Sequence, residues 1–569
     1  MSLTKSNELY AERDLGKLKA NIETGDYLEA NRELDALGLN KNSYTYLFFH
    51  SLICHKLGQF AQATHSYRKA RNSSFGFPVA LYQNYIAFCI EKKQYSSAIY
   101  AAERVVHSQV PTNKHIQRML GIAYSRSGRH EQALKILAML YRDHQLDVDV
   151  ITSYTSSLNE AKKHRDALSI LKQRKDVLGM SYRYLMAAGN TLKGLGRLNT
   201  ALSFFRSAER YKPENIEPTF NVAVCLQEMR KLDKSYEIYS RVLTKSSNHI
   251  AARWNRAEIL LLKKNFLDGF KEYEIRWLHD PALGKRRKLM LRIAPEPQDL
   301  DQITGKKVLV YYEQGYGDTI MFSRFLRKFE NLDVLVYFQP QQALLKLYAC
   351  SPLSIKTVQR QLNNSVDFSL PLGSLPKFLG IRSVDDCSVG SEDLLIGLKS
   401  EYKEFLSAQV SQNIERIGIA WTGNPKHGRD HERSINVLDV CKEIFTLRNI
   451  EFYSLHPVSP SDRELMPNLH NVHINTNQTS FLETALLINQ LDLVITVDTA
   501  VAHLAGALGK KTVVLLPPYP DWRWGIDNSD SYWYKSLYLL RRTGRSWLPA
   551  LREIRETLEH AIRFDDYKN

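Results

Sequence analysis

The stretch GRHEQALKILAML, Gly128 to Leu140, decides the fold of the first half of the chain because it recurs. Similar stretches begin at three other glycines: GDYLEANRELDAL at Gly25, GQFAQATHSYRKA at Gly58 and GRLNTALSFFRSA at Gly196. Each has an aromatic residue, leucine or histidine two positions after the glycine and an alanine five positions after it. Weaker copies from Lys93 and Lys162 keep the alanine. The first half is therefore built from an internal repeat.

The small residue of each copy sets the register of this repeat. Its separations run from 33 to 35 residues, at Ala30, Ala63, Ala98, Ala133, Ala167, Ala201, Ser235 and Gly269. A period of about 34 residues resembles the tetratricopeptide repeat (TPR), two short helices whose small side chains allow close approach. One pair cannot bury its apolar face alone, so neighbouring pairs must stack. We expect about eight repeats over residues 5–280 in a superhelix with a concave groove; the alternative is an unrelated helical bundle.

The second half changes to apolar runs that alternate with helical segments. The polar, proline-bearing residues 281–306 predict a linker. Buried strands are predicted at 307–312, 333–338, 416–421, 450–455, 491–497 and 511–516. Strands that are apolar throughout and separated by helices indicate parallel sheets covered on both faces. We predict two Rossmann-like lobes, 307–400 and 412–569, the second ending in a helix, with weak strands around SPLSIKTV (351–358) and a charged helix before residue 412.

Ligands of such sheets lie beyond the carboxyl ends of the strands, where the first notable loop is EQGYGDT, Glu313 to Thr319. Its glycines, Gly315 and Gly317, let the backbone bend and let a ligand approach. The loop lacks the third glycine of a dinucleotide fingerprint and the GK[ST] of a Walker loop. It places Asp318 at the start of a helix predicted to continue into SRFLRKF. The ordinary role of such an aspartate is a helix N-cap.

The second loop, WTGNPKHGRDHERSI from Trp421 to Ile435, leaves a predicted strand and is rich in His, Arg and Lys. The plain interpretation is a solvated surface loop. However, Arg433 and Ser434 precede an apolar helix, and an arginine suits bidentate contact with a phosphate.

The third loop, VDTAVAHLAGALGK, runs from Val497 to Lys510. Backbone N–H groups at the start of its helix predict an anion site. His503 is either part of this site or a core histidine with its hydrogen bonds satisfied. In the following PPYPDWRWGID, Trp522 and Trp524 either stack on a ligand ring in the cleft or pack the core.

Together these stretches resemble the catalytic region of TPR-containing bacterial glycosyltransferases, relatives of the heptosyltransferases. The resemblance covers residues 300–550, and the preceding repeats match the same architecture. It implies a GT-B fold, no bound metal or cofactor, and a nucleotide-sugar donor held between the lobes. It also implies that Asp318 is the general base, while Arg433 faces the donor phosphates. Donor-binding candidates are Gly315, Gly317, Gly423, Asn424, Arg433, Ser434, Asp498, Thr499, Ala500 and His503.

The chemistry of glycosyl transfer suits these residue types. A base must act on the acceptor, and positive charge or N–H dipoles must stabilise the leaving phosphate. Asp318 is the predicted base. Arg433 and the helix start at Thr499–Ala500 are predicted to stabilise the leaving phosphate. The sequence offers no convincing second carboxylate for a covalent intermediate, which favours an inverting, single-displacement transfer.

Composition narrows the function classes. The net charge of +16 favours anionic partners, and its densest basic cluster is GKRRK, Gly284 to Lys288. No nucleic-acid-binding motif accompanies this charge, so nucleic acid is not expected as a partner. The six cysteines are scattered, no signal peptide is evident, and no apolar run reaches the roughly 20 residues that span a bilayer. These features predict a cytoplasmic protein without a transmembrane segment.

The repeat array favours one class of acceptor for such a transferase. TPR grooves bind extended peptides and helices, so a protein acceptor is expected. The resemblance to two-domain transferases of this layout that modify flagellin implies flagellin or another surface protein as that acceptor. Two alternatives stay open. One is transfer to lipopolysaccharide or another glycan; the other is a non-catalytic TPR scaffold with a degenerate nucleotide-binding half.

Overall fold

The protein is described by a computed structural model that covers residues 15–73, 79–107, 113–351, 355–359, 366–388, 415–425, 429–466, 469–474, 480–544 and 546–559. The chain divides into two compact units, residues 1–225 and 226–569. The division falls within helix α14 (Ile216–Glu228). Within the described ranges, no helix combines the length and the apolar character needed to cross a membrane.

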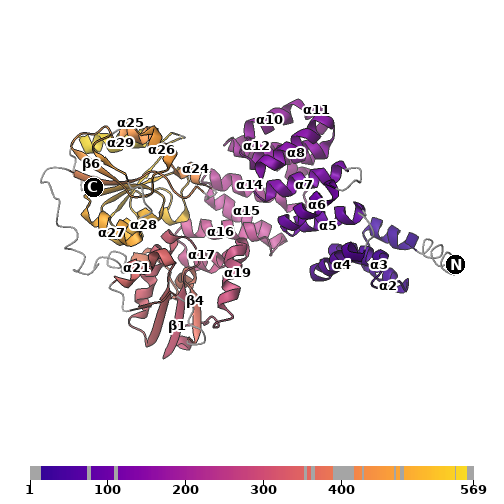
Figure 1. Cartoon of the computed structure of the whole chain (residues 1–569), viewed down its shortest axis with the longest axis horizontal. Helices are drawn as coiled ribbons and strands as arrows, with labels where there is room; N and C mark the ends of the chain where they lie inside the picture. Colours follow the sequence, from indigo (N-terminus) through magenta and orange to yellow (C-terminus); the bar gives the residue numbers. More distant parts are fainter. Residues whose placement is uncertain are drawn as a thin grey trace. The chain divides into compact units, whose positions relative to one another are not determined.

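The described residues of the first unit form helices and the turns between them (Figure 1). Its helices are α2 (Tyr27–Ala36), α3 (Tyr44–Lys56), α4 (Phe60–Ser73), α5 (Val79–Glu91), α6 (Tyr95–Val106), α7 (Lys114–Arg126), α8 (His130–Asp143), α9 (Val148–Glu160), α10 (His164–Gln173), α11 (Lys175–Leu178), α12 (Tyr182–Gly194) and α13 (Leu198–Tyr211). Helices pack in consecutive pairs, α3 on α4, α5 on α6, α7 on α8, α9 on α10 and α12 on α13. This arrangement confirms the predicted helical repeat.

The small residues of the register lie where the paired helices touch. Ala98, Ala133 and Ala201 are fully buried, as are the corresponding residues of the other copies. On the facing helix, a Cβ added to Gly121 would lie 2.6 Å from Leu137 Cγ. The close approach of the helices therefore requires small side chains, as the sequence predicts.

The turn between the two helices of each repeat has a left-handed residue. Gly128 has φ +82° and Gly196 has φ +71°. Lys93 and Lys162, which stand where the glycine is lost, keep the same conformation, with φ 56° and φ 60°. Arg230 (φ 59°) and Lys264 (φ 60°) repeat it in the second unit, so the register holds in the copies without glycine.

The second unit begins with the helices of the last copies. These are α15 (Leu232–Lys245), α16 (Ile250–Leu262), α17 (Phe266–Tyr273), α18 (Arg276–His279) and α19 (Pro281–Met290). The segment 281–306, expected to be a linker, therefore starts with a helix. Asp280 caps α19 by accepting a 2.8 Å hydrogen bond from the backbone N–H of Ala282, and a proline at the first helical position suits this start.

A four-stranded parallel sheet follows, in the order β3-β2-β1-β4. Its strands are β1 (Lys306–Tyr311), β2 (Val334–Gln339), β3 (Lys356–Thr357) and β4 (Phe368–Pro371). The helical elements around it are η1 (Asp301–Ile303), α20 (Tyr316–Phe322), η2 (Ser323–Phe329), η3 (Gln342–Leu344), α21 (Leu345–Ala349), η4 (Leu372–Ser374), α22 (Leu375–Phe378) and α23 (Val384–Ser388). SRFLRKF, predicted to continue the α-helix, is the 3₁₀ segment η2.

The second sheet has six parallel strands in the order β10-β9-β8-β5-β6-β7. The strands are β5 (Glu415–Ala420), β6 (Ile450–Ser454), β7 (Val472–His473), β8 (Leu493–Val497), β9 (Thr512–Leu516) and β10 (Leu537–Arg541). The helical elements are α24 (Asp430–Arg433), α25 (Val437–Glu443), α26 (Pro460–Leu465), α27 (Phe481–Gln490), α28 (Ala500–Ala507), η7 (Trp522–Trp524) and α29 (Leu548–Glu559). Figure 1 shows α25 and α29 on one side of this sheet and α27 and α28 on the other.

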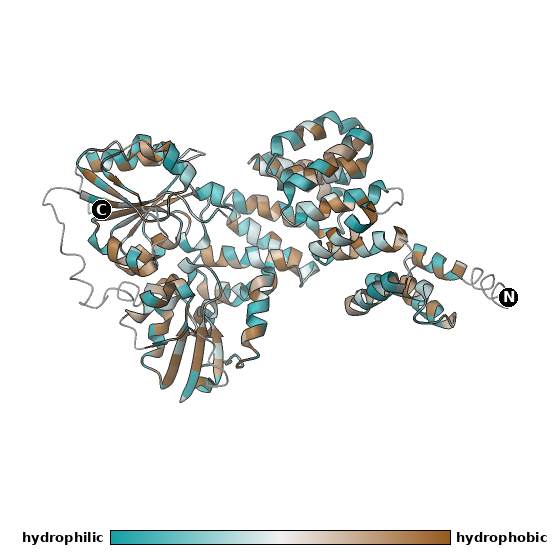
Figure 2. Cartoon of the chain, viewed as in Figure 1, coloured by the Kyte–Doolittle hydropathy of each residue, from teal (hydrophilic) through white to brown (hydrophobic). Residues whose placement is uncertain are grey.

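All six strands predicted from the sequence are present and pair in parallel. Figure 2 shows that the strands are mainly hydrophobic, and every residue of β8 and β9 is buried. The edge strands β7 and β10 are additions to the prediction, whereas β3 lies within SPLSIKTV and β4 lies in the region predicted to hold further weak strands. The charged helix expected before residue 412 lies outside the described residues.

Candidate functional site

The topology of the second sheet singles out one edge for a ligand. The chain passes from β5 to β6 and β7 on one side, whereas β8, β9 and β10 lie on the other side of β5. Strand order therefore reverses between β5 and β8. In open parallel sheets a ligand binds outside the carboxyl ends of the strands at such a switch point. The loops that leave these two strands are those that start at Trp421 and Val497.

Arg433 connects these two loops by a hydrogen bond. Its Nη1 donates a 2.9 Å hydrogen bond to the backbone oxygen of Asp498, and its Nε pairs with Asp430 Oδ1 at 3.2 Å. Ser434 Oγ accepts a 3.1 Å bond from the backbone N–H of Gly423. A Cβ on Gly423 would lie 2.7 Å from Arg433 Nη2, so a larger residue there would displace the guanidinium. Four predicted donor-site residues are thus brought together, and Asn424 lies in the same loop.

The start of α28 adds backbone donors at the same edge. Thr499 is its N-cap, and its Oγ1 accepts a 3.2 Å hydrogen bond from the N–H of Val501. Ala500 is the first helical residue. The first N–H groups of a helix have no partner within the helix and favour negative charge. The predicted anion site therefore lies beside Arg433.

Asp318 lies in α20, which follows β1 of the first sheet, and contacts η7, which follows β9 of the second sheet. Its Oδ2 accepts a 3.0 Å hydrogen bond from the N–H of Gly315, which closes the start of α20. Its Oδ1 accepts a hydrogen bond from Arg523 Nη2 in η7. The side chain keeps 24% of its surface exposed, so a ligand can reach it. Asp318 is both a helix cap and one half of an ion pair.

Packing explains one of the two glycines of the EQGYGDT loop. Gly315 has φ −69° and is not left-handed, so neither a sharp bend nor backbone strain explains it. A Cβ on Gly317 would lie 2.7 Å from His503 Cδ2 and 3.5 Å from Ala500 Cα. Gly317 therefore lets α20 lie directly against α28.

The first two residues of the loop anchor it to the preceding helices. Glu313 accepts hydrogen bonds of 2.7 and 3.2 Å from Arg276 in α18, and both side chains are buried. Gln314 exchanges hydrogen bonds with the Tyr273 hydroxyl in α17 at 2.9–3.1 Å. Because a buried ion pair needs both partners, Glu313 serves the fold and supports the position of Asp318.

His503, Trp522 and Trp524 are buried in an aromatic cluster. His503 stacks on Trp524 with ring centroids 5.0 Å apart, and its Nδ1 lies 3.1 Å from the Tyr534 hydroxyl. Burial, with Arg523 and Arg324 nearby, lowers the pKa of His503 to about 3, so the ring is neutral at pH 7. Trp522 packs edge-on against Tyr273 at 5.9 Å. These rings pack α17, α28 and η7 together within the second unit.

Asp521, a carboxylate beside Arg523, was not assigned a role from the sequence. Asp521 accepts hydrogen bonds from the backbone N–H (3.1 Å) and Nη1 (2.6 Å) of Arg523. Burial acts to raise the pKa of Asp521, but Arg523 outweighs it and the pKa is lowered. Asp521 is thus a second carboxylate on the same guanidinium as Asp318, which the sequence-based argument for an inverting mechanism does not take into account.

Glu258 in α16 and Asp498 also titrate in this region. Burial, with the negative charge of Asp521, raises the pKa of Asp498 to about 6 and that of Glu258 to about 7. Carboxyl groups with a pKa near neutrality are suited to proton transfer. Charged residues inside the aromatic PPYPDWRWGID string could have indicated Asp521, whereas Glu258 comes from a distant helix with no local signal.

Comparison with known proteins bears on both halves of the chain. Residues 7–183 match the family Tetratricopeptide repeat, and residues 462–530 match Glycosyltransferase family 9 (heptosyltransferase). The second match includes β8, α28, β9 and η7, and therefore Asp498, His503, Asp521 and Arg523. No curated protein matches the chain.

Solved structures similar to the chain include TPR proteins. A thermophilic TPR protein of Thermus thermophilus is 17% identical with a TM-score of 0.30, covering 32% of this chain and 97% of that one. A tetratricopeptide repeat protein of Parabacteroides merdae is 16% identical with a TM-score of 0.34, covering 41% and 92%. Pseudomonas aeruginosa PilF is 17% identical with a TM-score of 0.32, covering 40% and 99%.

The two family matches and the observed elements agree in their order along the chain. Helical repeats come first, and the parallel sheets with the switch-point site follow. The chain thus joins tetratricopeptide repeats to a region that is similar in sequence to the glycosyltransferases of family 9, the heptosyltransferases.

Proposed function

We propose that the protein is a glycosyltransferase that moves a sugar from a nucleotide-activated donor to an acceptor, within a GT-B pair formed by the two sheets. The observation that carries this proposal is the hydrogen bond from Arg433 to the Asp498 backbone, which joins the loops after β5 and β8 at the switch point. The family 9 match over residues 462–530 supports the same chemistry.

Arg433 and the start of α28 are suited to hold the donor phosphates. Arg433 uses Nε and Nη1 for its contacts, while its Nη2 makes no hydrogen bond with the described residues. Two N–H donors on Nη2 therefore stay available to an anion beside the helix start. As the bond between sugar and phosphate breaks, these donors stabilise the charge that develops on the leaving phosphate.

Asp318 is proposed to accept the proton of the attacking acceptor hydroxyl. Each of its oxygens makes one hydrogen bond, to Gly315 and to Arg523, and an ionised carboxylate can accept about four. The oxygen that attacks the sugar would then form its new bond as the phosphate departs from the opposite side. This single displacement inverts the sugar and uses no metal or further cofactor.

The repeats are proposed to recruit a protein acceptor, flagellin or another surface protein. The TPR match over residues 7–183 supports this because TPR grooves typically bind extended segments of proteins. Mass spectrometry of proteins that co-purify with the chain tests the proposal. A sugar mass on a co-purifying protein supports it, whereas a modified glycan and no modified protein would contradict the protein acceptor.

Binding of the donor is tested separately by thermal shift with nucleoside mono- and diphosphates. Wild type should be stabilised by at least one nucleotide, and Arg433→Gln should lose most of that shift. If none of the nucleotides stabilises wild type, the nucleotide-donor assignment is wrong.

A further inference from the structure

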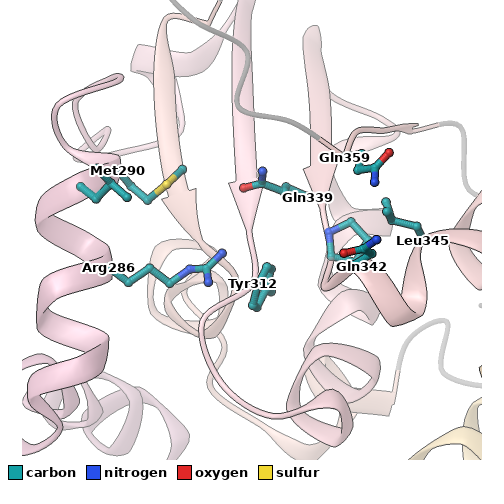
Figure 3. A pocket seen from close by; sticks show the side chains of 9 residues that line it. Arg286, Met290, Tyr312, Gln339, Gln342, Leu345 and Gln359 are labelled. Carbon is teal, nitrogen blue, oxygen red and sulfur yellow. The ribbon is translucent and has the colours of Figure 1, made fainter. Parts of the chain in front are cut away.

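A pocket of about 390 Å³ lies beside α19, outside the carboxyl ends of β1 and β2 (Figure 3). Tyr312 follows β1 directly, Gln339 ends β2, and Arg286 projects from α19. Its volume falls in the range of roughly 300–1,000 Å³ typical of small-molecule sites. All of its lining residues belong to α19 or to the first sheet and its loops, so it is separate from the donor loops of the second sheet.

Arg286 brings an available positive charge into this pocket. Its guanidinium carbon lies 3.5 Å from the centre of the Tyr312 ring. Stacking on a ring orients the guanidinium but leaves its N–H groups without acceptors. Its Nε is buried and has no hydrogen-bond partner among the described residues. The pocket therefore supplies several charged donors that an anion can use.

Three glutamine side chains complete the polar lining. Gln339, Gln342 and Gln359 all line the pocket; Figure 3 shows the Gln339 amide on the side of Met290 and Arg286, and Gln342 and Gln359 on the side of Leu345. Their amides make no hydrogen bond with the described residues. An amide both donates and accepts, which matches a hydroxyl group. The apolar part of the lining comes from Met290 and Leu345. The lining residues include no carboxylate.

We propose that this pocket binds an anionic sugar, a hydroxyl-bearing ring with a carboxylate or a phosphate. Arg286 would pair with the acidic group, and the amides of Gln339, Gln342 and Gln359 would bind the hydroxyls. The basic cluster Gly284–Lys288, which carries Arg286, adds positive potential around the entrance. Because it needs neither Asp318 nor Arg433, this binding is independent of the proposed transfer reaction.

The test uses the full chain and ligand-observed NMR titrations with three monosaccharides of the same ring. Glucuronate supplies the carboxylate, glucose 6-phosphate the phosphate, and glucose no charge. At least one acidic sugar should bind about tenfold more tightly than glucose, because glucose offers no charged group to the guanidinium of Arg286. The tighter of the two acidic sugars identifies the group that Arg286 recognises.

Variants decide whether this pocket is responsible. Arg286→Gln should weaken the binding of the acidic sugar about tenfold. Lys288→Gln removes the same charge from an exposed position on the same helix. It should change the affinity for the acidic sugar by less than about twofold, which is the typical size of a screened surface effect. Gln342→Ala, also exposed, should weaken binding without risk to folding. Equal losses in Arg286→Gln and Lys288→Gln, no preference for the acidic sugars, or equal binding of inorganic phosphate would overturn the proposal.

Discussion

Arg523 and Asp318 form an ion pair that links an element of the second sheet to an element of the first. The guanidinium also holds Asp521, so one buried arginine orients two carboxylates. The helix start, the ion pair and the neighbouring switch-point loops lie within one compact unit. The position of Asp318 thus depends on residues from both sheets.

Substitution of Arg523 should destabilise the second unit. Arg523→Met would leave two partly buried carboxylates without their partner, at a cost of roughly 3 kcal/mol, and Asp318→Asn in the same chain should offset part of that cost. All seven tryptophans lie in the second unit, so denaturation followed by tryptophan fluorescence reports on it alone. Additive effects of the two substitutions would show that the pair contributes nothing to stability.

The raised pKa of Asp498 predicts how stability varies with pH. Burial and Asp521 raise the pKa from 3.8 to about 6, so the folded state binds this proton more tightly than the unfolded state. The stabilising contribution is complete below 3.8 and is lost as the pH rises through about 6. Asp498→Asn should therefore increase stability at pH 8 relative to wild type, and this gain should vanish at pH 4.

The exposed Asp530→Asn serves as the matched control in the same unit. It should follow the wild-type pH profile throughout. A profile of Asp498→Asn parallel to that of wild type between pH 4 and pH 8 would contradict the assignment of this pKa.

In the turns of the repeats, introducing a glycine and removing a glycine should have opposite effects on the stability of the first unit. Lys162→Gly should relieve a left-handed lysine and stabilise the first unit by about 0.5–1 kcal/mol, after the greater flexibility of the unfolded glycine is deducted. Gly128→Ala should destabilise it by roughly 1 kcal/mol, although no atom lies within 4 Å of the new Cβ. Circular dichroism melts measure both; the same sign for both substitutions would refute the backbone explanation.

Removal of the first unit should separate recruitment from chemistry. A chain that begins at Pro213, in the loop before α14, keeps Glu258, Tyr273 and Arg276, which contact the catalytic region. We expect it to fold and to hydrolyse donor at the wild-type rate, but to modify the protein acceptor far more slowly. Unchanged acceptor modification by the shortened chain would rule out recruitment by the first repeats.

The sequence predicts the repeats and the central strands because their signals are local. The small residue of each TPR copy and each apolar run follow from neighbours in the chain, and even Lys93 and Lys162 keep the expected turn. The two-residue strand β7 is too short to show a pattern, and β3, of the same length, is predicted only as a weak strand within SPLSIKTV. Their pairing depends on adjacent strands that the sequence alone does not position.

The candidate site could be predicted only in part. Loops that leave the strands of a parallel sheet meet at one edge, so the meeting of Arg433 and Asp498 follows from strand order. The pairing of Asp318 with Arg523 does not follow from strand order, because the two residues are 205 positions apart in the chain. The glycine motif also does not predict the packing role of Gly317, because its contact with His503 depends on how α20 packs against α28.

The central claim is that Asp318 removes the proton of the acceptor beside the donor phosphate. The most direct measurement is nucleotide release from a panel of UDP-, GDP-, ADP- and CMP-sugars by wild type, Asp318→Asn and Asp521→Asn, with melting curves to confirm folding. We predict that wild type turns over one class of donor and that Asp318→Asn binds its nucleotide normally but is slower by about 10²–10⁴-fold, the usual contribution of a general base. Wild-type turnover by a folded Asp318→Asn variant would contradict the account.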